Sequence, residues 1–243
     1  MTDIKINHLT KVFGGVRAVD DLTISIAGGV ATGLIGPNGS GKTTLMNLIT
    51  GLLNPDCGTI EIGAKTFDSI NPRDLRALRI ARTFQDGRLV DQLSVDDNLL
   101  LAIAENDTCK SLLQINTGPM RQRLEQTLKK IGLVAHRKKT AEELSYGQRK
   151  LLELGRALIQ DANIYLLDEP FSGLQEKMVE NVLGLISELK QSGKTIVIIE
   201  HNMGLIKQIA DKLIVLDHGQ LLASGTPNTV LKNKAVQQAY LGV

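Results

Sequence analysis

The sequence has no tryptophan, three tyrosines, four phenylalanines and two cysteines in 243 residues. With so few rings for base stacking and a net charge of only +2, it lacks the features of a nucleic-acid-binding surface, and no nucleic-acid partner is expected. Cys57 and Cys109 do not have the spacing of a metal or redox motif, so we interpret both as packing residues.

Long hydrophobic runs are also missing. No apolar stretch approaches the 18 residues that a membrane-spanning helix requires, and the N-terminus shows no secretory signal pattern. Because the sequence given ends at Val243, we expect no appended regulatory domain. We therefore expect one domain over residues 1–243 that stays in the cytosol.

A glycine-rich motif follows a short apolar run at residues 30–35 and precedes a helical pattern. It fits G-x-x-x-x-G-K-[ST], in which glycines let the backbone wrap around phosphates, the lysine offsets their charge and the hydroxyl ligates Mg²⁺. A chance glycine-rich turn is the alternative. The motif predicts a nucleoside triphosphate and Mg²⁺ as ligands, bound by Gly36, Pro37, Asn38, Gly39, Ser40, Gly41, Lys42, Thr43 and Thr44.

A second motif is an apolar strand, residues 164–167, that ends in Asp168 and Glu169. It resembles a Walker B segment, in which the first carboxylate holds Mg²⁺ and the second polarises the attacking water. We attribute this division of roles to strand alternation, which points neighbouring side chains in different directions. Two solvated carboxylates at a strand end are the alternative reading.

Upstream lies Leu144-Ser145-Tyr146-Gly147-Gln148, followed by an apolar helical face. This run resembles the LSGGQ signature of the ATP-binding cassette (ABC) family, with Tyr146 in place of the first glycine. In that family the signature completes the ATP site of a second subunit. The resemblance therefore implies that these side chains meet a γ-phosphate bound by a partner cassette in a head-to-tail dimer.

The resemblance also assigns isolated residues. It implies that Phe13 stacks on adenine, that Gln85 is the Q-loop amide contacting metal and water, and that His201 is the switch histidine. Each has a plainer alternative: Phe13 as a packing ring, Gln85 as an ordinary loop amide. The family D-loop reads S/A-G-L-D, but here Gln175 replaces its carboxylate, which predicts weaker contacts with the partner and slow or partner-dependent hydrolysis.

The order of patterns predicts the fold class: an α/β P-loop NTPase with a mostly parallel core sheet, an N-terminal antiparallel β layer and an inserted α-helical subdomain at about 86–160. The subdomain carries one apolar face, and the signature lies near its end. A hairpin at 217–220 and a terminal helix toward Leu241 complete the chain. The apolar face consists of Leu124, Leu128, Ile131 and Ala135.

Several segments across the chain together resemble ATP-binding subunits of branched-chain amino-acid uptake transporters, with urea, amide or lipid systems as alternatives. The resemblance implies permease subunits that dock near residues 85–93, an external solute-binding protein, and a position on the cytoplasmic face of the cell membrane. A soluble ABC ATPase of an assembly system, a lipid exporter and a small-molecule phosphotransferase remain as other readings. The signature argues against the phosphotransferase, which has no need of it.

Overall fold

The computed structural model describes residues 1–84, 89–103 and 118–241, so Gln85 and Cys109 lie outside the described residues. Its N-terminal layer is a four-stranded antiparallel sheet in the order β2-β1-β4-β5. Alternating apolar residues on these strands turn one face of the sheet inward. The strands are β1 (Ile4–Phe13), β2 (Val16–Ile26), β4 (Cys57–Ile62) and β5 (Lys65–Phe67).

The core sheet has six strands in the order β10-β9-β3-β8-β7-β6. Five are parallel, and every residue of the central strands β3, β7 and β8 is buried, as continuous apolar runs predict. The sixth, β10, pairs antiparallel with β9 through the predicted hairpin. The strands are β3 (Ala31–Ile35), β6 (Ile80–Arg82), β7 (Ile164–Asp168), β8 (Thr195–Ile199), β9 (Lys212–Asp217) and β10 (Gln220–Gly225).

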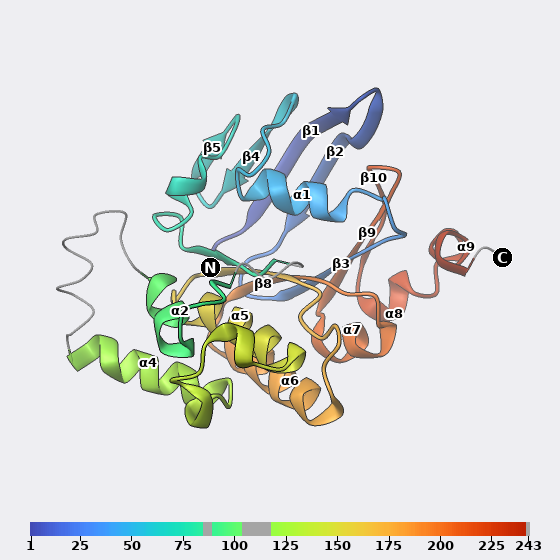
Figure 1. Cartoon of the computed structure of the whole chain (residues 1–243). Helices are drawn as coiled ribbons and strands as arrows, with labels where there is room; N and C mark the ends of the chain where they lie inside the picture. The colour runs from blue at the N-terminus through green and yellow to red at the C-terminus, as the bar shows by residue number, and fades with distance from the viewer. Residues whose placement is uncertain (85–88, 104–117, 242–243) are drawn as a thin grey trace.

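Helices cover both faces of the core sheet (Figure 1). The buried face of α1 (Lys42–Ile49) shares one apolar cluster with the antiparallel layer, so this helix lies between the two sheets. A second cluster joins the opposite face of the core sheet to the remaining helices. Those helices are α2 (Val95–Leu101), α4 (Gly118–Lys130), α5 (Tyr146–Leu158), α6 (Glu176–Gln191), α7 (Met203–Ile209), α8 (Pro227–Val230) and α9 (Lys234–Leu241).

The helical insertion contains α2, α4 and α5, with single 3₁₀ turns at Val134–His136 and Ala141–Glu143. Three members of its predicted apolar face are buried, but Ala135 is exposed. The prediction failed there because α4 ends at Lys130 and Gly132 follows with φ of +69°, which breaks the helical period. The boundaries of a separate subdomain at 86–160 stay a prediction.

Two expectations from composition have different outcomes. Cys57 is exposed, so its interpretation as a packing residue was wrong. It is the first residue of β4 and does not belong to the buried face of the sheet. Within the part of the chain that the structure describes, no helix is both long and apolar enough to cross a membrane.

Candidate functional site

The glycine-rich loop joins β3 to α1, as its sequence context predicts. A cavity of about 330 Å³ lies against it. Asn38, Gly39, Lys42 and Thr43 form one side of this cavity, and the ends of β7 and β8 form the other. The site therefore opens at the carboxyl ends of parallel strands, where α/β sheets place their ligands.

Two glycines explain the shape of the loop. Gly41 has φ of +100°, and a Cβ atom there would collide with the carbonyl oxygen of Ala18. Gly39 has φ of +80°, with open space where its Cβ would lie. The Gly219 N–H donates to the carbonyl oxygen of Ser40 at 3.1 Å, so the β9–β10 hairpin supports the loop from behind.

Lys42 is the buried cation of the site, with 7% of its surface exposed. Its Nζ donates to the carbonyl oxygens of Gly36 and Pro37, both at 2.8 Å. Burial lowers the pKa of Lys42, and the nearby carboxylates of Glu169 and Asp168 oppose that shift. The loop thus presents a positive charge, together with the N-terminus of α1, to the cavity.

Asp168 and Glu169 take different directions, but strand alternation is not the reason. Asp168 is the last residue of β7, whereas Glu169 has left the strand with φ of +45°. Its N–H donates to the carbonyl oxygen of Ile199 at 3.0 Å, which holds this uncommon conformation in place. The left-handed turn keeps Asp168 buried and brings Glu169 to the cavity wall.

Glu169 and His201 form a close pair across the cavity. The Nε2 atom of His201 lies 2.9 Å from Oε1 of Glu169, and both residues line the cavity. His201 follows β8 directly, so the parallel pairing of β7 and β8 sets this distance. The structure thus brings the two predicted residues together, in a geometry that can hold and orient a water molecule beside a phosphate.

Sequence reasoning missed the residues that support Asp168. The Asp168 N–H donates to Thr83 Oγ1 at 3.0 Å, and Arg82 Nη2 lies 3.7 Å from Asp168 Oδ2. Burial raises the pKa of Asp168, and the charge of Arg82 opposes this rise. Strand β6 pairs with β7 and places both supports, a proximity that separate sequence segments do not reveal.

The signature residues lie at the start of α5, outside the walls of the cavity. Ser145 caps the helix: its Oγ accepts from the Gln148 N–H at 3.3 Å, and Gln148 Oε1 accepts from the Ser145 N–H at 2.9 Å. Gln148 Nε2 is also 3.0 Å from Nε2 of His136. The capped start of α5 lies at the surface, where Ser145 is exposed.

The signature packs against the predicted D-loop of the same chain. A Cβ on Gly173, which has φ of +69°, would collide with the ring of Tyr146, and a Cβ on Gly147 would meet Met178 Sδ at 2.7 Å. Tyr146 nevertheless keeps 57% of its surface exposed. Gln175 is the exposed N-cap residue of α6, and its side chain makes no capping hydrogen bond.

The other predicted nucleotide-binding residues lie at different distances from the cavity or outside the described residues. Thr43 and Thr44 line the cavity, but Phe13 is not among its described lining residues. Phe13 ends β1 with 44% of its surface exposed, and Lys11 Nζ lies 5.6 Å from its ring centroid. Its predicted adenine contact stays a prediction, as does the role of Gln85, which lies outside the described residues.

The donors beside the cavity suit Mg²⁺. Thr43 supplies a hydroxyl and Asp168 a carboxylate, the oxygen ligands that this ion prefers. No cluster of three or more His, Cys, Asp or Glu able to hold a metal occurs among the described residues. Such a sparse set fits an ion held jointly by protein and phosphate oxygens rather than by a protein cage.

Comparisons with known proteins agree with this geometry. A family model described as "ABC transporter" matches residues 19–172, and one described as "Branched-chain amino acid ATP-binding cassette transporter" matches residues 220–243. The high-affinity branched-chain amino acid transport ATP-binding protein LivG of Escherichia coli is 34% identical, covering 98% of this chain and 97% of the relative. The corresponding protein BraF of Pseudomonas aeruginosa is 32% identical with the same coverage.

Solved structures are similar over the same span. A nucleotide-free ATP-binding cassette from an ABC transporter has a TM-score of 0.88 and 32% identity, with 100% of both chains covered. A cassette in its ADP conformation has a TM-score of 0.84 and 33% identity, also with full coverage. A dimeric cassette in a post-hydrolysis state, bound to ADP and Pi, has a TM-score of 0.79 and 25% identity, covering 92% of this chain and 98% of that one.

Proposed function

This chain belongs to the ABC transporter family as an ATP-binding and ATP-hydrolysing subunit, and from that premise we propose that it powers the uptake of branched-chain amino acids. The observation that carries the cargo assignment is the match of residues 220–243 to the branched-chain transporter model, which lies outside the general ABC match. The full-length similarity to LivG and BraF supports it.

In this proposal the cavity beside the P-loop binds the ATP phosphates. Lys42 offsets their negative charge, and the N–H groups of the loop and of α1 donate hydrogen bonds to the phosphate oxygens. Thr43 and Asp168 hold Mg²⁺, joined by Gln85; the ion supplies further charge neutralisation when bound. Phe13 of β1 stacks on the adenine.

Glu169 is the proposed general base, and His201 the residue that keeps it oriented. Glu169 Oε1 accepts from the attacking water, while the 2.9 Å contact with His201 Nε2 fixes the carboxylate against the cavity. The positive φ of Glu169 favours this role, because such conformations at a site are held there by their surroundings at a cost in strain. As Glu169 takes the proton, the water oxygen bonds to the γ-phosphorus in line with the β–γ bridging oxygen, and the bond from that oxygen to the γ-phosphorus breaks, which releases ADP and phosphate.

In this proposal, the exposed signature acts on the ATP of a second cassette. Ser145, Tyr146, Gly147 and Gln148 serve the γ-phosphate bound by the partner, so ATP binds the closed dimer more tightly than the open one and drives closure. Closure is transmitted to permease subunits, and an external binding protein delivers the cargo. Such a subunit works on the cytoplasmic face of the cell membrane.

A pull-down from detergent-solubilised membranes tests this function. Tagged Glu169→Gln chain, incubated with ATP, is expected to recover a polytopic membrane pair, identified by mass spectrometry, and cells lacking this chain should lose leucine uptake. Glu176→Gln, an exposed carboxylate in the first turn of α6, is the matched control and should hydrolyse ATP at the parent rate. Recovery of soluble proteins alone would favour the assembly ATPase, and a lipid exporter would leave leucine uptake unchanged.

A further inference from the structure

A histidine outside the nucleotide cavity contacts the signature. His136 ends the 3₁₀ turn at Val134–His136, which follows α4, and its Nε2 atom lies 3.0 Å from Nε2 of Gln148 in the first turn of α5. Helices α2, α4 and α5 contact one another in this part of the molecule (Figure 1). The two side chains are 12 residues apart in the sequence, so the fold of the helical insertion brings them together.

The helix cap determines which atom donates in this contact. Gln148 Oε1 accepts from the Ser145 N–H at 2.9 Å, so the amide oxygen is already committed to the cap. Turning the amide over would set its NH₂ group against that backbone N–H, and two donors would then face each other. The amide nitrogen is therefore the atom that faces His136. Because this nitrogen is only a donor, His136 Nε2 is the acceptor.

The same reasoning gives the tautomer of the histidine. A neutral ring whose Nε2 accepts carries its proton on Nδ1. In the part of the chain that the structure describes, Nδ1 of His136 is shielded from solvent and has no hydrogen-bond partner. The opposite tautomer would leave Nδ1 equally unpartnered and would also set an Nε2–H group against the amide of Gln148. The contact with Gln148 thus selects the tautomer that accepts.

The segment that carries His136 is tied to the start of α2. We call residues 134–139 the histidine turn. The Asp96 N–H donates to the carbonyl oxygen of Arg137 at 3.1 Å, and the Val95 N–H donates to that of Lys139 at 2.9 Å. Arg137 Nε also donates to Oδ2 of Asp96, a buried carboxylate, at 3.0 Å. A side chain held by such surroundings presents its acceptor at a fixed position.

The cap at Ser145, by contrast, depends on a flexible side chain. Ser145 is exposed, and Gln148 closes the cap by accepting from the Ser145 N–H. A glutamine side chain loses considerable rotamer freedom when it is ordered, and this loss opposes closure of the cap. A second hydrogen bond, from the Gln148 amide to the fixed Nε2 of His136, restricts that freedom in advance and favours the closed cap.

We propose that His136 is a positioning residue for the signature: its Nε2 holds the amide of Gln148, which keeps the helix start at Ser145 in the shape that meets the ATP of a partner cassette. This inference rests on the proposed function, which supplies the ATP of the partner. His136 is not among the described residues that line the chain's own cavity. Loss of its acceptor should therefore lower ATP turnover and leave nucleotide binding by the isolated chain unchanged.

The first test determines the tautomer on the isolated chain. The sequence has four histidines, so ¹⁵N-histidine labelling gives few signals, and a His136→Leu spectrum identifies those of His136. Long-range ¹H–¹⁵N correlation spectra, recorded under mildly alkaline conditions in which an ordinary histidine is neutral, are expected to show a proton on Nδ1 and none on Nε2. A proton on Nε2, in the opposite tautomer or in the charged ring, would overturn the proposal.

Three variants measure what the contact does for turnover. His136→Leu removes the acceptor, and phosphate release should fall about fivefold, the factor that one typical hydrogen bond represents. His136→Gln offers a side-chain oxygen in place of Nε2 and should restore most of the turnover. Val134→Thr, an exposed substitution on the same 3₁₀ turn, is the matched control and should keep the parent rate. Equal turnover in His136→Leu and Val134→Thr would refute the role of His136.

Binding of a fluorescent ATP analogue is the companion measurement. It should stay within about twofold of the parent in all three variants, because the P-loop is unchanged. A loss of binding in His136→Leu that matches its loss of turnover would mean that the substitution damages the chain's own site, and the proposal would be wrong.

A double-mutant cycle separates positioning from general stabilisation. Gln148→Leu removes the amide that His136 holds, so adding His136→Leu to it should change turnover by less than about twofold. A further loss as large as that in the parent background would show that His136 does not act through Gln148, which would overturn the proposal.

The tautomer is measured without any partner, so its outcome is distinct from that of the membrane pull-down. A proton on Nε2 together with recovery of a polytopic membrane pair would leave transport standing and refute the role of His136. A proton on Nδ1 and the expected cycle, with recovery of soluble partners alone, would support the role of His136 and refute transport.

Discussion

The P-loop region and the signature region are built in contrasting ways. Lys42, at the start of α1, and Asp168, at the end of β7, are both buried; Lys42 bonds to carbonyl oxygens of its loop, and Asp168 contacts Arg82 and Thr83. Ser145 and Tyr146 are exposed at the start of one helix, and Ser145 bonds only within its own turn in the contacts that the structure gives. The contrast teaches that one region is a cavity assembled within the chain, whereas the other is an exposed helix start, as its proposed role at the ATP of a partner requires.

The largest expected effect comes from a substitution in the P-loop region. Glu169→Gln should reduce steady-state phosphate release by about 100-fold or more, because a general base typically contributes 10²–10⁴-fold. Equilibrium binding of a fluorescent ATP analogue should remain within about twofold of the parent, since Lys42 and the loop are unchanged. Turnover at the parent rate would contradict the assignment of the base.

The next prediction concerns the signature region. Ser145→Asp keeps a good helix cap but brings a negative charge to the γ-phosphate of the partner, so turnover should fall about tenfold or more with an unchanged unfolding temperature. ATP binding to the isolated chain should not change. Ser145→Ala is the matched comparison: it adds no charge but removes the helix cap, which typically costs about 1 kcal/mol of folding stability. If the monomeric Ser145→Asp chain bound ATP more weakly than the parent monomer, the signature would belong to the ATP site of its own chain and the prediction would be wrong.

How far the sequence predicts each region follows from the same contrast. The P-loop, the strand ending in Asp168 and the apolar helix after the signature are local patterns, and the structure has the corresponding strand, loop and helices. The positive φ of Glu169 and the contact of Arg82 with Asp168 depend on strands that are far apart in the sequence. Only their pairing in the sheet creates them, so sequence reasoning could not assign them.

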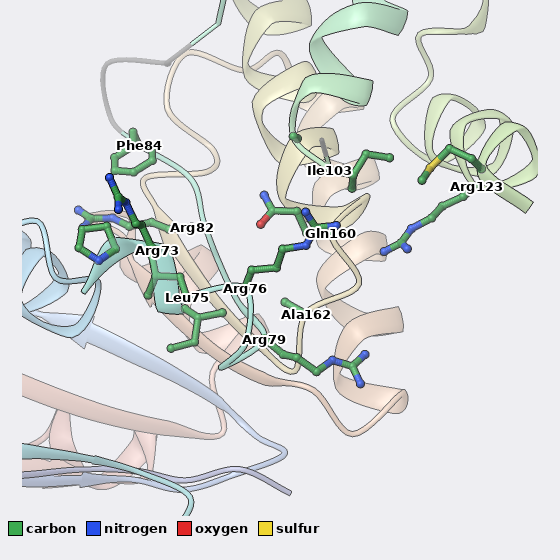
Figure 2. Close-up of a pocket in the computed structure, with 14 residues that line it drawn as sticks. Arg73, Leu75, Arg76, Arg79, Arg82, Phe84, Ile103, Arg123, Gln160 and Ala162 are labelled. Atoms are coloured by element: carbon green, nitrogen blue, oxygen red, sulfur yellow. The ribbon is translucent and has the colours of Figure 1, made fainter. Parts of the chain in front are cut away.

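The pocket of Figure 2, whose described lining includes five arginines, lies between these extremes. Arginine recurs every third residue at 73, 76, 79 and 82, a pattern visible in the sequence itself. The recurrence does not itself predict a cleft, because residues 72–82 form a 3₁₀ turn, an irregular segment and a strand rather than one helix. The remaining arginine, Arg123, comes from α4, and only the folded chain brings it to the opposite wall.

A smaller effect should reveal the contact between the signature and the D-loop. Gly173→Ala introduces strain at φ of +69° and a collision with the Tyr146 ring, so urea unfolding should show a loss of about 1–3 kcal/mol. In a Tyr146→Gly background the collision is gone and only the backbone strain remains, so the same substitution should cost less. Equal costs in the two backgrounds would mean that ring and loop are energetically independent.

Gln175→Asp should have the smallest effect, and it should raise stability and ATP turnover, whereas the other substitutions lower them. Gln175 is the N-cap residue of α6 without a capping bond, and Asp is a strongly preferred cap, so the substitution should stabilise the chain by up to about 1 kcal/mol. It also restores the carboxylate that the family D-loop presents to its partner, and ATP turnover should rise a few-fold. Gln175→Asn separates these effects, because Asn caps a helix without adding charge. Equal ATP turnover in the two variants would assign the rise in turnover to the helix cap. No rise in either variant would refute the prediction that Gln175 slows hydrolysis.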